Sequence, residues 1–121
     1  MPRQVGRIKE NIINLLNLNC PINTPILLGQ SNIEHMKKSH SYDYDIYSDE
    51  LINILDNPDY VGLMKDGSIE YVKEFKTDND FVKVSVRIAL SGNYFARTLY
   101  TLNNKRVQEY IAKGTLKKVW R

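Results

Sequence analysis

The sequence predicts an α+β fold, with N-terminal helices packed on a four-stranded antiparallel β-meander and a C-terminal helix after it. Apolar residues recur at helical spacing in the first half, and the pattern changes to alternation from residue 61 onward. The turns between the alternating segments are too short for a crossover, so neighbouring strands must be antiparallel. We expect the helices to cover one face of the sheet and to leave the other free for function.

The first predicted elements are a helix and a strand. Apolar residues from Ile8 to Leu16 keep helical spacing, which indicates a helix over about residues 8–18 that stops at Pro21. The apolar run at residues 25–28 is typical of a short buried strand.

Two further helices precede the meander. Ser31, followed by a glutamate three residues later, is a capping-box signature that opens a helix at about residues 32–39. A third helix, capped by Ser48 or Asp49, must end before Pro58 because the residue that precedes a proline avoids the α region.

β-Branched and aromatic residues dominate four alternating segments in the second half. An asparagine at position 103 or 104 caps a final helix that stops at Gly114, and the tail is either one last short strand or a frayed end. The four predicted strands cover residues 61–64, 69–75, 81–90 and 94–102.

Length and composition limit the class of protein. The chain has 121 residues, 42% of them hydrophobic and 26% charged, so we predict one globular domain over residues 1–121. A single cysteine, Cys20, cannot close an intramolecular disulfide, which favours a reducing, cytoplasmic location. The apolar runs are too short to span a membrane, and the first residues lack the apolar stretch of a cleaved signal.

Charge is distributed unevenly along the chain. Residues 41–80 hold 3 basic and 11 acidic groups, a balance of −8, whereas residues 81–121 hold 9 basic groups and 1 acidic group, a balance of +8. The basic third can present a positive field to a polyanion such as RNA, unless folding brings the acidic middle over it.

One predicted strand separates basic from aliphatic side chains. In the segment 81–90 alternate residues are aliphatic and belong against the helices, whereas Lys83, Ser85 and Arg87 share the open face. If the register allows, Tyr71 and Lys73 of the preceding strand lie beside them. Such a face is chemically suited to hold a phosphate.

The last strand has two orientations consistent with its sequence. In the one that we prefer, Phe95 and Leu99 point to the core, and Thr98 and Tyr100 then join the open face. In the reverse orientation Arg97 and Thr101 join the open face instead.

The only histidines, His35 and His40, are candidates for proton transfer near neutral pH. On an ideal helix an i, i+5 pair points about 140° apart, too far to chelate one metal ion as an i, i+4 pair does. We therefore predict no metal site. We also expect no cofactor, because the sequence has no Gly-rich phosphate loop, nucleophile elbow or Cys-x-x-Cys motif.

Several segments together resemble a known family. They are similar to the phage-associated nuclease-like domains of the barnase, EndoU, colicin and RelE superfamily, most of all to the third phage-borne group, and the resemblance covers residues 4–119. The most specific pieces are the His-x4-His helix end and an Asn-Pro-Asp-Tyr turn. The segments that carry the resemblance are 30–40, 54–61, 93–100 and 113–116.

The resemblance implies metal-independent cleavage of RNA. In such enzymes the 2′-hydroxyl attacks its adjacent phosphate and leaves a 2′,3′-cyclic phosphate and a free 5′-hydroxyl. The family's helix histidines, basic sheet positions and polar end of the last strand correspond to His35 and His40, to Lys73 and Arg87, and to Thr98 and Tyr100.

These correspondences lead to a set of predicted roles. We predict His40 as the principal general acid or base, with His35 or Tyr100 as its counterpart. Glu70 and Glu74 occupy even-numbered positions of their strand and Lys73 an odd-numbered one, so both carboxylates should point away from the face of Lys73. We therefore expect no carboxylate on the basic face and assign the base to histidine. The phosphate is expected to be held by Arg87 and Lys73 and oriented by Thr98, with Lys83, Ser85, Arg97 and Tyr71 as further substrate-binding residues.

The expected substrate is RNA, with tRNA as one candidate, and the expected context is a toxin or phage effector. An antitoxin or immunity protein is the expected protein partner, because its carboxylates can cover the basic face. The alternative is a non-catalytic RNA-binding or protein-interaction module of phage origin, with RNA binding that weakens steeply with salt and no cleavage.

Overall fold

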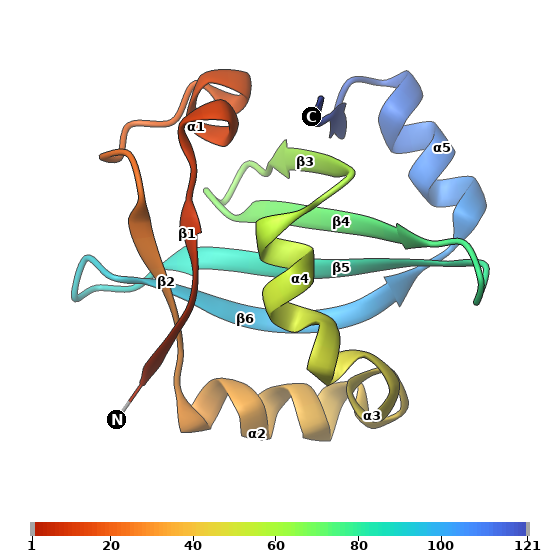
Figure 1. Ribbon diagram of the computed structural model, residues 1–121, viewed down its shortest axis with the longest axis horizontal. Coiled ribbons are helices and arrows are strands. Elements are labelled where there is room, and N and C mark those ends of the chain that lie inside the picture. Colours follow the sequence, from red (N-terminus) through yellow and green to blue (C-terminus); the bar gives the residue numbers. More distant parts are fainter. Residues whose placement is uncertain (1, 121) are drawn as a thin grey trace.

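The computed structural model describes residues 2–120, which form one seven-stranded sheet with helices on both of its faces (Figure 1). The predicted antiparallel meander is confirmed as the centre of this sheet. Its strands are β3 (Tyr60–Leu63), β4 (Ile69–Phe75), β5 (Asp80–Ile88) and β6 (Tyr94–Leu102).

Three more strands extend the sheet at both edges, giving the order β1-β2-β6-β5-β4-β3-β7. β1 (Arg3–Ile8) pairs antiparallel with β2 (Thr24–Leu28), which runs parallel to β6. β7 (Lys117–Lys118) pairs with β3, so the tail forms the last short strand that was one of its two expected states.

The first predicted helix is wrong in its extent. The helix α1 covers only Glu10–Leu16, and the preceding residues form β1. The hydrogen bonds of β1 come from β2, which lies beside it only in the folded chain. Apolar spacing alone therefore could not distinguish the end of this strand from the start of a helix.

The remaining helices are α2 (Gln30–Ser39), α3 (Ser41–Tyr47), a 3₁₀ turn η1 (Ser48–Glu50), α4 (Leu51–Asp56) and α5 (Asn104–Ala112). α3 was not predicted; it follows a break at His40, whose backbone is not helical. The cap of α5 is confirmed, because the Asn103 side chain accepts hydrogen bonds from two backbone amides of the first turn. No helix within residues 2–120 is long and apolar enough to cross a membrane.

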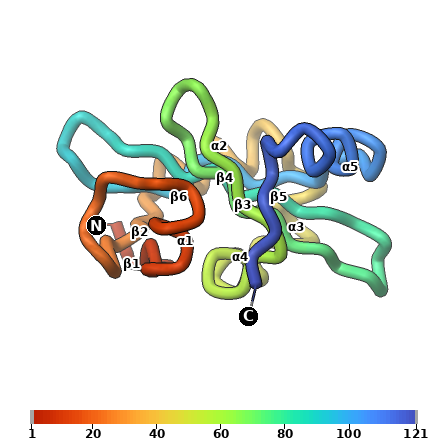
Figure 2. The backbone as a smooth tube through the Cα atoms, turned by 90° about the horizontal axis from the view of Figure 1, so that it is seen from above, coloured from red at the N-terminus to blue at the C-terminus, as the bar shows by residue number. Residues whose placement is uncertain are grey.

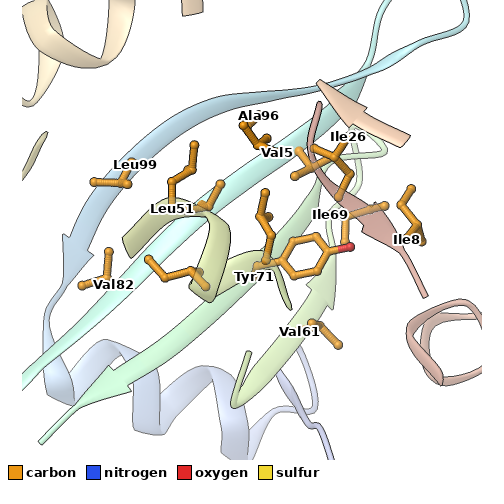
Figure 3. Close-up of a cluster of buried hydrophobic side chains, with 14 of the residues drawn as sticks. Val5, Ile8, Ile26, Leu51, Val61, Ile69, Tyr71, Val82, Ala96 and Leu99 are labelled. Carbon is orange, nitrogen blue, oxygen red and sulfur yellow. The ribbon is translucent and has the colours of Figure 1, made fainter. Parts of the chain in front are cut away.

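The main core lies between α4 and the sheet, and Figure 3 shows the apolar side chains that fill it. Ile54 and Leu55 of α4 are fully buried against β4 and β5. The sheet contributes the side chains of one face of the meander, among them Val82, Val84 and Leu99.

α5 packs on the opposite face, which corrects the expectation that all helices share one face (Figure 2). Val107 of α5 forms a separate buried cluster with Val72 and Phe81. Val72 pairs with Lys83, so this cluster lies on the same face as the basic side chains of β5. α5 closes one end of that face, and the candidate site occupies the part it leaves uncovered.

Candidate active site

A pocket of about 510 Å³ opens on the face of the sheet that α4 does not cover. Its floor is formed by β4, β5 and β6, and its walls by the start of α2 and by the turn between β3 and β4. The floor contributes Glu70, Lys83, Ser85, Arg87, Arg97, Thr98 and Tyr100; the walls contribute Ser31, Asn32, His35, Met64, Asp66 and Ser68.

A buried carboxylate forms the centre of the floor. The register places Glu70 opposite Ser85, and only 9% of the Glu70 side chain is exposed. One Glu70 oxygen lies 2.9 Å from the Lys83 amine, and the other accepts a hydrogen bond from the Ser85 hydroxyl. A carboxylate has about four acceptor positions, so Glu70 retains capacity to accept a substrate proton.

Lys83 connects this carboxylate to an aromatic pair. The Lys83 amine lies 4.5 Å from the centre of the Tyr100 ring, and His40 stacks on the same ring with centroids 4.5 Å apart. Burial alone would lower the pKa of Lys83, but hydrogen bonding and charge interactions with Tyr100 and Glu70 outweigh it, so the pKa is raised. Lys83 is therefore a fixed positive charge at neutral pH.

A β-bulge brings an additional cation to the pocket. Ser85 pairs with Thr98 and Val86 pairs with Ala96, so Arg97 is an extra residue in β6. Bulges redirect side chains in this way and are frequent next to active sites. As a result, Arg97 and Thr98 both line the pocket although they are neighbours in the chain.

The same bulge resolves the two orientations of the last strand. On one side of it, Leu99 is buried in the core while Thr98 and Tyr100 line the pocket, as predicted. On the other side the alternation is shifted, and Phe95 pairs with Arg87 on the pocket face. The expectation that Phe95 points to the core is therefore wrong.

Arg87 and Thr98 offer two different contacts for a ligand. The Arg87 guanidinium lies 3.9 Å from Asp66, with both side chains about half exposed, so this ion pair is weak. Hydrogen bonds from Ser68 hold the pKa of Asp66 below its usual range. The Thr98 hydroxyl oxygen is buried and has no hydrogen-bond partner within residues 2–120. A bound phosphate oxygen would satisfy it.

The two histidines occupy different places. His35 is exposed on α2 and lines the pocket. His40 is not among the lining residues, and it reaches the site only through its stacking on Tyr100. No cluster of three or more His, Cys, Asp or Glu side chains that could hold a metal ion occurs in the part of the chain that the structure describes.

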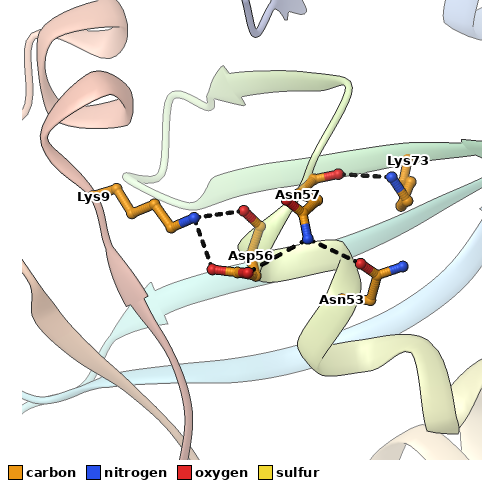
Figure 4. A network of polar contacts seen from close by, with 5 residues as sticks. All are labelled: Lys9, Asn53, Asp56, Asn57 and Lys73. Carbon is orange, nitrogen blue, oxygen red and sulfur yellow. Dashed lines mark hydrogen bonds and ion pairs between the residues drawn. The ribbon is translucent and has the colours of Figure 1, made fainter. Parts of the chain in front are cut away.

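Two predicted site residues lie on the other face of the sheet. Lys73 pairs with Val82 and donates a hydrogen bond to the backbone carbonyl of Asn57 at the end of α4 (Figure 4). Tyr71 pairs with Val84 and is fully buried in the core (Figure 3). The prediction that both lie beside Lys83 is wrong, because the register between β4 and β5 puts odd-numbered residues of β4 against the aliphatic residues of β5.

The same register brings in the carboxylate that the sequence analysis did not expect on this face. Side chains alternate between the two faces along a strand. Since Tyr71 and Lys73 face the core, Glu70, which directly precedes Tyr71, must face the pocket. The signal was present in β4 itself, because Ile69 and Tyr71 are apolar and Glu70 between them is not. Lys73 obscured it, since its basic side chain suggested the opposite assignment.

Tyr71→Phe is expected to leave the site intact. The Tyr71 hydroxyl has no hydrogen-bond partner within residues 2–120, so its removal should leave stability at pH 7 unchanged or raise it by up to about 1 kcal/mol. Burial, with a smaller effect from Cys20, raises the pKa of Tyr71, so its contribution to stability is lost as pH rises above its ordinary value of about 10. Urea unfolding at pH 7 and again in alkaline solution should show that the variant loses less stability than the native protein as the pH is raised. A folded variant without the native activity would contradict the assignment of Tyr71 to the core.

The fold and the pocket together define an α+β protein with a polar, cation-rich site on an open sheet face, holding one buried carboxylate and one accessible histidine. The chain belongs to the family described as phage-Barnase-EndoU-ColicinE5/D-RelE like nuclease3, whose model matches residues 3–109. No curated protein and no solved structure matches the chain. The family match confirms the resemblance drawn from the sequence and indicates a nuclease.

Proposed function

We propose that this protein is an endoribonuclease that cleaves RNA by attack of the 2′-hydroxyl on the adjacent phosphate. The observation that carries the proposal is the pocket itself. It sets the Glu70 carboxylate among three cations, Lys83, Arg87 and Arg97, on the open sheet face of a nuclease-family domain. A carboxylate and cations in one pocket suit a reaction that removes a proton and stabilises a more negative phosphorane.

The reaction needs a base, an acid and fixed positive charge. Glu70 accepts the proton of the 2′-hydroxyl as the oxygen–phosphorus bond forms. Lys83 and Arg87 stabilise the phosphorane, and His35 at the pocket wall donates a proton to the leaving 5′-oxygen as its bond to phosphorus breaks. The products are a 2′,3′-cyclic phosphate and a 5′-hydroxyl. Because RNA supplies its own nucleophile, this scheme requires no metal-activated water.

His40 has a different place in this scheme from the one expected from the sequence. It contacts the Tyr100 ring, and Tyr100 lines the pocket and lies against Lys83. These contacts support a role for His40 as a positioning residue, which holds the Tyr100 ring in place and, through that ring, the Lys83 amine. The sequence-based role, direct proton transfer by His40, requires an imidazole and not merely an aromatic ring.

A pair of His40 variants separates these two roles. His40→Phe keeps a ring that can stack on Tyr100, so it should retain RNA cleavage within about threefold, whereas His40→Ala should lower it more, by about tenfold. Equal losses of 10²-fold or more in both variants would instead identify His40 as the acid or base. The pH profile of kcat provides a second readout, because a positioning residue should leave its shape unchanged.

The function is tested by incubating the purified protein with total RNA and with tRNA in excess EDTA, and by mapping the product ends. Cyclic-phosphate ends are expected, and a DNA strand of the same sequence should stay intact because it lacks the 2′-hydroxyl. RNA that is bound but never cut would overturn the proposal and favour the non-catalytic RNA-binding alternative.

We also propose that an antitoxin or immunity protein inhibits this activity in the cytoplasm by covering the pocket. Carboxylates of such a partner would pair with Arg87 and Arg97, which are both exposed. The cations of the pocket support an inhibitor with an acidic surface. Among RNA substrates of the enzyme, tRNA is one candidate.

A further inference from the structure

A second groove lies beside the active-site pocket, at the outer edge of β3. It measures about 570 Å³ and runs between the end of α1, the turn after β3 and the segment that follows α5. Met64 lines both the groove and the pocket, so the two hollows adjoin at this side chain. Among residues 2–120, the lining of the groove includes three lysines, Lys65, Lys113 and Lys117, and no carboxylate.

These lysines are available to bind an anion. All three are exposed, and none of their side chains forms an ion pair or a hydrogen bond within residues 2–120. Other lysines of the chain differ in this respect. Lys9 pairs with Asp56 at 2.7 Å, and Lys83 pairs with Glu70 at 2.9 Å. The groove therefore carries an uncompensated positive charge next to a site that already binds polyanions in our proposal.

The backbone that carries two of the lysines is held firmly against the sheet. A Cβ atom at Gly62 of β3 would clash with the carbonyl oxygen of Thr115, so only glycine allows this close approach. Gly114 has a φ of +78°, which lets the chain turn directly after α5. This close packing fixes the backbone that carries Lys113 and Lys117 along the groove wall.

We propose that this lysine groove is a second phosphate-binding subsite, which holds the single-stranded RNA segment that leaves the active-site pocket past Met64. The inference rests on the proposed function for the identity of its ligand. Lysines that contact the phosphates of a flexible nucleic-acid backbone, without contacts to the bases, bind single strands with little sequence preference and with strong salt dependence. The groove should therefore set affinity for long substrates and leave the chemical step unchanged.

The test compares two triple variants of equal net charge. Lys65→Gln, Lys113→Gln and Lys117→Gln together remove the cations of the groove, and the matched control Arg7→Gln, Lys38→Gln and Lys76→Gln removes three exposed cations that line neither the pocket nor the groove. The probe is a 2′-O-methyl RNA of about twelve nucleotides, which binds but cannot be cleaved. Its dissociation constant is measured over a series of KCl concentrations.

Loss of the groove lysines should weaken binding by roughly tenfold to hundredfold at low salt. It should also reduce the slope of log K against log salt by about 2, since each lost phosphate contact contributes about 0.7 on a single strand. For cleavable RNA, the groove variant should raise KM for a long strand, with kcat unchanged, and should cleave a dinucleotide as the native protein does.

The outcomes separate this inference from the proposed function. A groove variant that binds and cleaves like the matched control would overturn the subsite and leave the ribonuclease proposal intact. A native protein that cuts no RNA, yet binds the probe through the three lysines, would support the subsite and remove the catalytic proposal. If the native protein does not bind the probe at all, the subsite is overturned and an acidic protein segment becomes the alternative ligand.

Discussion

Glu70→Gln is expected to lower kcat/KM for RNA cleavage by about 10²- to 10⁴-fold, the usual effect of removing a general base. The amide matches the carboxylate in shape; its oxygen can accept a hydrogen bond from Lys83 and its NH2 group can donate one to the Ser85 hydroxyl oxygen, so the pocket should keep its form. It cannot take up the proton of the 2′-hydroxyl. Binding of the uncleavable 2′-O-methyl strand should therefore remain close to native.

Glu74→Gln is the matched control for this prediction. Glu74 lies on the same strand and the same face as Glu70, four residues further along, and does not line the pocket. It should cleave RNA at the native rate. Full activity in a folded Glu70→Gln variant, established by the appearance of cyclic-phosphate ends, would exclude Glu70 as the base and return that role to a histidine.

Lys83→Met is expected to destabilise the protein by about 3 kcal/mol and to abolish measurable RNA cleavage. The Lys83 side chain is 14% exposed and its partner Glu70 only 9%, so the substitution leaves a carboxylate in a largely desolvated place without its cation. Breaking such a pair from one side typically costs about 3–5 kcal/mol, and the partial exposure here favours the lower end. Urea unfolding at pH 7 measures the effect directly.

The double variant Lys83→Met with Glu70→Gln distinguishes structure from catalysis. Removing both charges leaves no unpaired ion, so much of the lost stability should return. Cleavage should not return, because both the base and the phosphate-binding cation are gone. Stability losses that simply add in the double variant would show that the two side chains are not coupled.

This stabilisation should also depend on pH with a definite sign. The pKa of Lys83 is raised in the folded protein, so its contribution is complete below the ordinary lysine value of about 10.5 and is lost as pH rises through the raised pKa. The stability difference between native protein and Lys83→Met should therefore be constant near neutral pH and should shrink only in strongly alkaline solution.

Local sequence determined the central part of this molecule. Alternation of apolar residues and short polar turns specify the meander β3 to β6, because both signals act between residues close in the chain. The same alternation within β5 placed Lys83, Ser85 and Arg87 on one face, since the direction of side chains along a single strand follows from pleating alone.

Tertiary structure decided which partners those side chains meet. The register of β4 against β5 puts Glu70 in the pocket and Lys73 on the opposite face, although the two strands are adjacent in the chain. A shift of one residue would exchange the two faces of a strand, and the residues of β4 alone give conflicting signals, because Ile69 and Tyr71 favour one assignment and Lys73 favours the other. The bulge that brings Arg97 beside Thr98 is likewise a property of the pair β5 and β6.

The sequence by itself thus determined the meander, the basic face of β5 and the family to which the chain belongs. Only the tertiary structure decided the strand β1, the pairing of the outer strands, the side of the sheet on which α5 packs, and the carboxylate of the candidate site. The physical reason is that pleating and helical periodicity are local, whereas strand pairing, register and burial are relations between segments that meet only when the chain folds.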